Sequence, residues 1–260
     1  MSDWAAKAYG EDIFDEAAKG YVEYCMNVAK EQRRYESTSE FTNKELSDIK
    51  EKIYEVEGYM DPYMWAAILI YGFWPSMIDH IRMYRDVFIM RLPENPKVLE
   101  LASGHGVMGL LAAHHLADLR VDGCDISPPA VAIAEKLTAA SGLGERVNFE
   151  VKDALDLESA GEPGTYNGVI AAMLAEHLAD PISLFKTIKH HLAPDGIAFF
   201  STAIESAQPD HIYEFNFESE PLKMAEDVGL RVTRLVSDAS NSKAESRFQP
   251  RATAMILTSR

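Results

Sequence analysis

The sequence predicts an α/β fold in which a mainly parallel sheet follows a helical N-terminal extension. From about residue 97 onward, short β-like runs alternate with helical stretches, whereas the residues before 93 are helical in pattern and rich in aromatic side chains. Strands that alternate with helices of about ten to fifteen residues indicate βαβ units and a parallel sheet. The expected strands are 97–102, 119–125, 146–151, 166–172, 196–202, 230–236 and 252–258.

Two of the helices between these strands have recognisable start signals. Ser127 and Asp180 each stand directly before a proline, the pattern of an N-cap residue followed by a first-turn proline. The polar stretch 237–251 between the last two strands has no apolar helical period. We therefore expect those two strands to form an antiparallel hairpin instead of another crossover.

The N-terminal helices are predicted from caps and prolines. Thr42 to Glu45 fits a capping box and predicts a helix through about Glu57. Two further helices are expected over residues 61–74 and 76–92.

The segment "PENP" (93–96) predicts a hinge between two parts of the chain. We expect a helical region over residues 1–92 and a cofactor-binding domain over residues 93–260. The aromatic side chains of the first region either pack in a core or form a lid over a substrate site, and a dimer interface is an alternative.

Charge and composition exclude several classes of function. The chain of 260 residues has a formal net charge of −16 and no basic stripe, so we expect neither a nucleic-acid partner nor a membrane partner. The longest apolar run, 64–74, is too short to span a bilayer. Two cysteines and an acidic start without a signal-peptide pattern predict a cytoplasmic protein.

The stretch "VLELASGHGVMG" (98–109) contains glycines in the spacing G-x-G-x-x-G. Such a turn between a strand and a helix lets a ligand approach the backbone near a helix N-terminus. The glycine pattern alone does not discriminate, because it fits both the pyrophosphate of a nicotinamide cofactor and another adenosine cofactor.

Three acidic residues distinguish between a nicotinamide cofactor and another adenosine cofactor. Glu100 at the strand end would repel a pyrophosphate and attract an ammonium and a sulfonium group, as in S-adenosylmethionine. Asp125 ends the second strand, where a carboxylate can accept hydrogen bonds from ribose hydroxyls. Asp153 ends the third strand and could accept a hydrogen bond from the adenine amino group, which the dinucleotide pattern does not require.

Four segments, "VLELASGHG", "VDGCDIS", "FEVKDALDL" and "YNGVIAAMLAEHLADP", resemble the successive motifs of class I S-adenosylmethionine-dependent methyltransferases. The resemblance covers about residues 95–235 and is closest to the small-molecule branch with the ubiquinone- and menaquinone-type enzymes. It implies a Rossmann-like seven-stranded sheet with a reversed last strand. It also implies S-adenosyl-L-methionine as cofactor and a small-molecule acceptor.

The resemblance also assigns individual residues to the cofactor. Ala102 stands where the family often has glycine, and we expect a negative φ for this alanine. The implied cofactor residues are Glu100, Gly104 and Gly106 at the methionine part, Asp125 at the ribose, Ile126, Asp153 and Ala154 around the adenine, and Ala102 and Ala172 along the site.

Two histidines are the catalytic candidates. His177 follows the fourth strand, and His211 lies in a loop after the fifth strand that resembles the family's His-x-x-x-Phe loop, with Phe215. The ordinary pKa of histidine, about 6.5, suits proton removal at neutral pH. The alternatives are a cap or packing role for His177 and a structural hydrogen bond for His211. Glu176 fits a solvated helix residue better than a ligand-facing carboxylate.

No Cys/His cluster has the spacing of metal ligands, so no metal site is predicted. Adjacent histidines on a helix point about 100° apart, although distant residues such as His177 and His211 could still assemble a site. Residues 171–174 lack the family's Asn-Pro-Pro-Tyr signature for amide or nucleobase methylation. Two alternative functions stay open: an NAD(P)-dependent oxidoreductase and a non-catalytic, cofactor-binding partner subunit. A homodimer is also considered.

Overall fold

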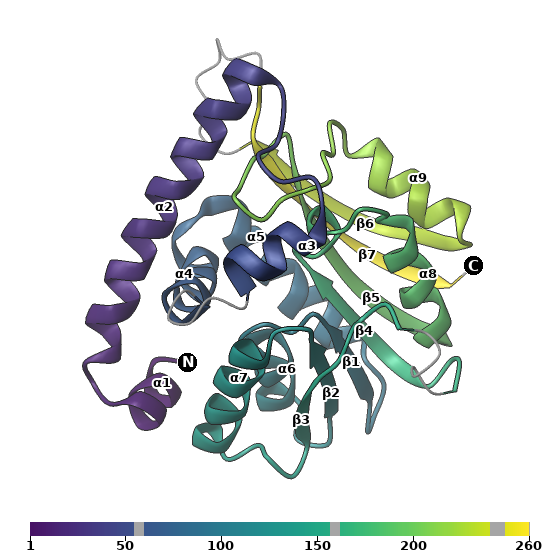
Figure 1. Ribbon diagram of the computed structural model, residues 1–260. Coiled ribbons are helices and arrows are strands. Elements are labelled where there is room, and N and C mark those ends of the chain that lie inside the picture. Colours follow the sequence, from purple (N-terminus) through teal and green to yellow (C-terminus); the bar gives the residue numbers. More distant parts are fainter. Residues whose placement is uncertain (55–59, 157–161, 240–247, 260) are drawn as a thin grey trace.

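A computed structural model describes residues 1–54, 60–156, 162–239 and 248–259. Its centre is a seven-stranded sheet with the order β3-β2-β1-β4-β5-β7-β6 (Figure 1). The strands are β1 (Lys97–Leu101), β2 (Arg120–Asp125), β3 (Val147–Val151), β4 (Tyr166–Ala172), β5 (Leu192–Ile204), β6 (Leu230–Ala239) and β7 (Arg251–Ser259).

The strand directions confirm the predicted sheet. β1 pairs in parallel with β2 and β4, whereas β7 lies antiparallel between β5 and β6. β5 begins four residues before the expected position, at Leu192 instead of Gly196. The pairing of β4 and β5 shifts register between Tyr166 and Gly168, and this irregularity accommodates the turn-like sequence 193–196 within the strand.

Helices cover both faces of the sheet, as expected where parallel strands are buried on both sides. In Figure 1, α6 and α7 lie on one side and α8 and α9 on the other. Consecutive residues alternate between the two cores: Val98 belongs to one buried cluster and Leu99 to the other, as do Phe199 and Phe200. The helices are α6 (Val107–His115), α7 (Pro128–Ser141), η4 (Ala175–His177), α8 (Ile182–His191) and α9 (Ser219–Asp227).

The N-terminal helices share their core with the sheet. Ala5, Trp65 and Phe88 lie in the same buried cluster as Val98 of β1. α2 runs along the outside of α4, where an added Cβ on Gly20 would lie 2.6 Å from the Pro62 carbonyl oxygen. The elements are α1 (Ser2–Tyr9), α2 (Ile13–Thr38), α3 (Leu46–Ile49), η1 (Lys50–Tyr54), α4 (Met60–Phe73), α5 (Pro75–Met83), η2 (Tyr84–Phe88) and η3 (Ile89–Arg91).

Of the predicted caps, only the one at Ser127 is confirmed. Its hydroxyl accepts a hydrogen bond of 3.4 Å from the Ala130 N–H. The capping box is wrong, because Thr42 donates its hydroxyl to Glu31 and Glu45 precedes α3 without a side-chain cap. The cap at Asp180 is also wrong: α8 begins at Ile182, one residue later than expected. The expected end of the helix at Glu57 lies outside the described residues.

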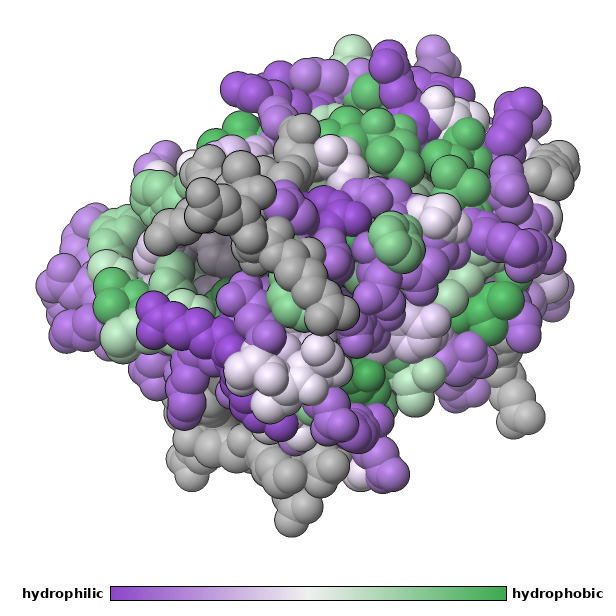
Figure 2. All heavy atoms as spheres, turned by 90° about the horizontal axis from the view of Figure 1, so that it is seen from above, coloured by the Kyte–Doolittle hydropathy of each residue, from purple (hydrophilic) through white to green (hydrophobic). Residues whose placement is uncertain are grey.

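The visible surface is mainly polar. Figure 2 shows a face on which hydrophilic residues predominate and hydrophobic residues form small separate groups. Within the described ranges, none of the helices combines the length and the apolar character needed to cross a membrane.

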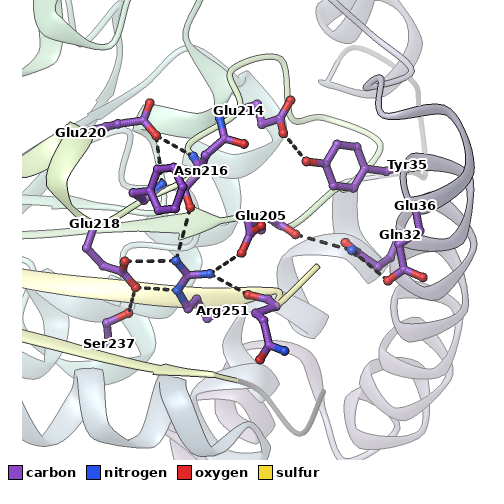
Figure 3. Close-up of polar contacts among 12 residues, drawn as sticks. Gln32, Tyr35, Glu36, Glu205, Glu214, Asn216, Glu218, Glu220, Ser237 and Arg251 are labelled. Carbon is purple, nitrogen blue, oxygen red and sulfur yellow. Dashed lines mark hydrogen bonds and ion pairs between the residues drawn. The ribbon is translucent and has the colours of Figure 1, made fainter. Parts of the chain in front are cut away.

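The loop from β5 to α9 is anchored by Arg251 at the start of β7 (Figure 3). The guanidinium donates to Glu218 at 2.5 and 3.0 Å and to Glu205 at 2.6 Å. On the other side, the Gln32 side chain of α2 accepts a hydrogen bond of 2.9 Å from the Ala207 N–H. These contacts tie both ends of the loop that carries His211 to the sheet and to α2.

Candidate active site

The backbone turns sharply where β1, β4 and β5 end. Ala102, Met173 and Glu205 directly follow these strands and have φ values of 50°, 51° and 49°. The expected negative φ at Ala102 is therefore wrong. A left-handed conformation is uncommon outside glycine and is frequent at functional sites. Here the three residues lie at the carboxyl ends of adjacent parallel strands and therefore at one edge of the sheet.

The two expected methionine-binding glycines have different surroundings. Gly104 (φ 51°) lines both of the cavities described next, and an added Cβ would meet only Met64. Gly106 (φ 67°) lines neither, and an added Cβ would lie 2.5 Å from the Phe149 ring. The structure thus gives Gly106 a packing role at the start of α6.

Two adjoining cavities of about 720 and 870 Å³, including space open to solvent, lie at this edge. Glu100, Ala172 and His211 line the first cavity. The adenosine candidates line the second. Both cavities share the residues Tyr63, Met64, Ala102, Gly104, Met173 and His177. Apart from Gly106, the sequence-predicted residues therefore come together; the second cavity holds Asp125, Ile126, Asp153 and Ala154.

Glu100 is a buried carboxyl at the inner end of the site, with only 3% of its surface exposed. Its Oε2 accepts a hydrogen bond of 2.9 Å from the Gly109 N–H. Burial raises the pKa of Glu100 to about 8, and the nearby carboxyl of Asp125 adds to this increase, against the opposing effect of the Gly109 hydrogen bond. A cation bound beside Glu100 would favour its ionised form.

Asp125 shapes the glycine-rich turn. One carboxylate oxygen accepts from the Gly104 N–H and the other from the Ser127 N–H, both at 2.8 Å. Each carboxylate oxygen has a second acceptor position, so Asp125 can also accept hydrogen bonds from ribose hydroxyls. Asp153 is exposed and makes a local turn in which its Oδ1 accepts a 2.9 Å hydrogen bond from the Leu155 N–H.

Both catalytic candidates belong to a cluster with Glu176. The potential ligand atoms of Glu176, His177 and His211 all lie within 4.8 Å of one another. Each histidine places its Nδ1 2.8 Å from a backbone carbonyl oxygen, that of Asp210 for His177 and that of Ser206 for His211. Because a carbonyl oxygen can only accept, each Nδ1 carries the proton and each neutral ring keeps its lone pair on Nε2.

The pKa values of the two histidines move in opposite directions. Burial would lower the pKa of His177, but the carboxyl groups of Asp210 and Glu176 outweigh it, so that this pKa is raised. Burial and the neighbouring His177 lower the pKa of His211 to about 4. His211 is therefore neutral at physiological pH.

The sequence analysis misinterprets one site residue and does not predict another. Glu176 is only 1% exposed and lines the first cavity, so the interpretation as a solvated residue is wrong. The Asp210 carboxylate accepts a 2.6 Å hydrogen bond from the Tyr63 hydroxyl and lies 3.6 Å from the His177 ring. The sequence offers one sign of this role for Asp210, which is its position directly before the candidate His211.

Comparisons with known proteins find similarity to methyltransferases. A family model described as a methyltransferase domain matches residues 99–198. A ubiquinone biosynthesis O-methyltransferase from Actinobacillus pleuropneumoniae is 28% identical over 107 residues, or 41% of this chain and 45% of that protein. A ribosomal protein L11 methyltransferase from Trichlorobacter lovleyi is 30% identical over 129 residues, or 50% of this chain and 39% of that protein. The matches span less than half the length of either relative.

One solved structure extends the likeness over more of the chain. Geranyl diphosphate C-methyltransferase from Streptomyces coelicolor A3(2), in complex with Mg²⁺, geranyl diphosphate and S-adenosyl-L-homocysteine, has a TM-score of 0.58 and 12% identity. The match covers 79% of this chain and 85% of that chain. At this identity the likeness shows the fold alone.

The strand order defines a Rossmann-like methyltransferase fold with a reversed last strand. Together, the family match over residues 99–198 and the relatives support a methyltransferase domain within this fold.

Proposed function

We propose that this protein transfers a methyl group from S-adenosylmethionine to a small-molecule acceptor. The observation that carries the proposal is the pair of adjoining cavities, with Glu100 in one, Asp125 and Asp153 in the other, and His177 lining both. The arrangement suits a cofactor with a cationic amino-acid end and an adenosine end. It leaves the cluster of Glu176, His177 and His211 for the acceptor.

The residues fit the cofactor by charge and shape. The Glu100 carboxyl is buried, and a cationic ligand would compensate its ionised form. Asp125 and Asp153 offer carboxylate acceptors for the ribose and the adenine, while Ile126 and Ala154 supply apolar contacts. A pyrophosphate carries no cation that would compensate an ionised Glu100, and the Asp125 carboxylate would repel it, which disfavours the oxidoreductase alternative.

The cofactor supplies the reactive sulfonium methyl group, and the protein aligns the acceptor and excludes water. We propose that α4 forms a wall of the site, since Tyr63 and Met64 line both cavities. His177 and His211 line the first cavity, and their Nε2 lone pairs could receive a proton from an acceptor bound there. These catalytic roles stay predictions, as does the division of the chain at residues 92 and 93.

A small acceptor is favoured by the charge of the chain and by the lining of the first cavity. The net charge of −16 disfavours nucleic acid. Tyr24, Tyr63 and Tyr71 line the first cavity and supply the aromatic surface that is typical of small-ligand sites. The ubiquinone and geranyl diphosphate enzymes are named for small molecules, whereas the L11 enzyme is named for a ribosomal protein.

The acceptor class can be tested with cofactor labelled on its methyl group. The protein is incubated with a cell extract that has been separated into small-molecule, protein and nucleic-acid fractions. We expect label in the small-molecule fraction, and we expect Asp125→Ala to abolish it. Label found only in protein or nucleic acid would contradict the proposal. Absence of any transfer from a cofactor that binds would favour the non-catalytic alternative.

We further propose a cytoplasmic location, because the two cysteines, Cys25 and Cys124, are free thiols. The homodimer and the absence of nucleic-acid and membrane partners stay predictions.

A further inference from the structure

We propose that Glu176, His177 and His211 bind a divalent first-row transition-metal ion at the acceptor end of the first cavity. Two imidazoles and one carboxylate are a ligand set typical of such ions, and the set leaves coordination positions open. The sequence spacing gave no sign of it, because His211 comes from a separate loop after β5. The folded chain brings the three side chains together.

The three ligand atoms are available. Both histidines have a free lone pair on Nε2, because their Nδ1 atoms donate to backbone carbonyls. Glu176 accepts a 2.7 Å hydrogen bond from Thr202 through Oε2, while its Oε1 is buried and has no hydrogen-bond partner among the described residues. A buried carboxylate oxygen without a partner is costly, and a bound cation would satisfy it.

The distances allow the ion to bind after a small contraction. Ligand–metal bonds of about 2.1 Å place neighbouring ligand atoms about 3 to 3.5 Å apart. One ring nitrogen of each histidine and one carboxylate oxygen of Glu176 lie within 4.8 Å of one another, and the two imidazole rings are perpendicular, with centroids 5.0 Å apart. Side-chain rotations must bring these atoms about 1.5 Å closer together for ligand–metal bonds of that length to form.

The surroundings resemble the outer shell of a metal site. Metal-binding histidines almost always donate their other ring N–H to a carbonyl or carboxylate, and both rings do so here. The Asp210 carboxylate, 3.6 Å from the His177 ring, adds negative charge beside the site. Of its two oxygens, Oδ2 accepts from Tyr63, and Oδ1 is buried without a hydrogen-bond partner in the described part of the chain.

The role of the ion rests on the proposed function. An open coordination position facing the cavity would take a hydroxyl oxygen of the acceptor and lower the pKa of that hydroxyl. The proton passes to water, the oxygen–methyl bond forms as the sulfur–methyl bond breaks, and S-adenosylhomocysteine leaves. In this case the lone pairs of the two histidines bind the ion and do not accept the proton. The ion would favour an acceptor that carries a hydroxyl group.

Metal binding is tested without reference to activity. The full chain is stripped with a chelator and titrated with Co²⁺, whose visible absorption reports its ligands, and with Zn²⁺ by calorimetry. We expect one ion per chain. His211→Ala and Glu176→Gln should each weaken binding by about 100-fold or more. The matched control His115→Ala removes an exposed histidine and should leave binding unchanged. Circular dichroism confirms that each variant is folded.

Failure of the wild-type chain to bind Co²⁺ or Zn²⁺ stoichiometrically overturns the proposal, even if a variant does not fold. Binding that persists in both folded variants also overturns it. Calorimetry with S-adenosylmethionine on the metal-free chain separates the two proposals. Cofactor binding without a metal site leaves the proposed function standing, whereas a metal site without cofactor binding refutes only the proposed function.

Discussion

At the scale of single residues, the buried Glu100 carboxyl is the group that most directly distinguishes a cationic cofactor from a pyrophosphate. Burial raises its pKa to about 8, so the free protein carries a proton there at neutral pH. Binding of a cation requires the ionised form, and the proton is released. The affinity for S-adenosylmethionine should therefore rise with pH by up to about tenfold per unit below pH 8 and level off above it.

Glu100→Gln tests this assignment. The amide oxygen can still accept from Gly109, but the negative charge is lost, so binding should weaken by about 1.5–3 kcal/mol and lose its pH dependence. Calorimetry across the pH range measures both effects. The exposed control Glu135→Gln on α7 should bind like the wild type. Unchanged affinity and unchanged pH dependence in Glu100→Gln would show that this carboxyl does not contact the cofactor.

Ala102 makes a separate prediction about stability. Its φ of 50° is unfavourable for alanine and free of steric cost for glycine. Ala102→Gly should therefore raise the free energy of unfolding by about 0.5–1 kcal/mol, after the greater chain entropy of glycine is subtracted. Ala132→Gly, at an exposed position within α7, should instead lower it by about 1 kcal/mol. Urea denaturation of both variants decides: if Ala102→Gly is as destabilising as the control, the left-handed conformation is wrong.

At the scale of elements, the loop between β5 and α9 depends on Arg251. The guanidinium donates hydrogen bonds to Glu205 and Glu218, which lie at the two ends of this loop. These hydrogen bonds lower the pKa of Glu218 to about 2. Arg251→Met should lower the free energy of unfolding by about 1–2 kcal/mol, since its charge-assisted bonds are partly shielded from water.

Hydrogen exchange measures whether this loss is local. Arg251→Met should speed exchange of the amides in residues 205–218, the segment that carries His211. Arg231→Met, at an exposed position on β6, is the matched control and should leave that segment unchanged. Equal exchange in the two variants would mean that the ion pairs do not hold the loop.

The sequence predicts regular elements better than the contacts between them. Strand positions followed from hydrophobic runs and turn residues, because these are local signals. The early start of β5 depends on an irregular pairing with β4, and the failed cap at Thr42 depends on a contact with Glu31 of α2. Both are tertiary effects that no local pattern contains.

The same distinction applies to the site. Glu100, Asp125 and Asp153 could be placed because each lies at or just beyond the carboxyl end of a strand, and parallel strands end at one edge. The burial of Glu176 and its approach to His211 depend on the path of a loop stabilised by α2 and β7. That path is set by long-range contacts, so the metal-ligating potential of the cluster could not be predicted from spacing.

At the scale of the whole molecule, the N-terminal helices and the sheet form one structure with a shared core. α4 contributes Trp65 to that core and Tyr63 and Met64 to both cavities. The site is therefore assembled from the loops of the sheet and from a helix outside the predicted cofactor-binding domain. We expect these adjoining cavities to bind S-adenosylmethionine.

Calorimetric titration of the wild-type chain with S-adenosylmethionine, S-adenosylhomocysteine and NAD tests that claim most directly. We expect both adenosyl compounds to bind with one molecule per chain, and we expect NAD to give no binding heat. Asp125→Ala should weaken the binding of the adenosyl compounds more than His211→Ala does. Binding of NAD, with none for either adenosyl compound, would contradict that claim.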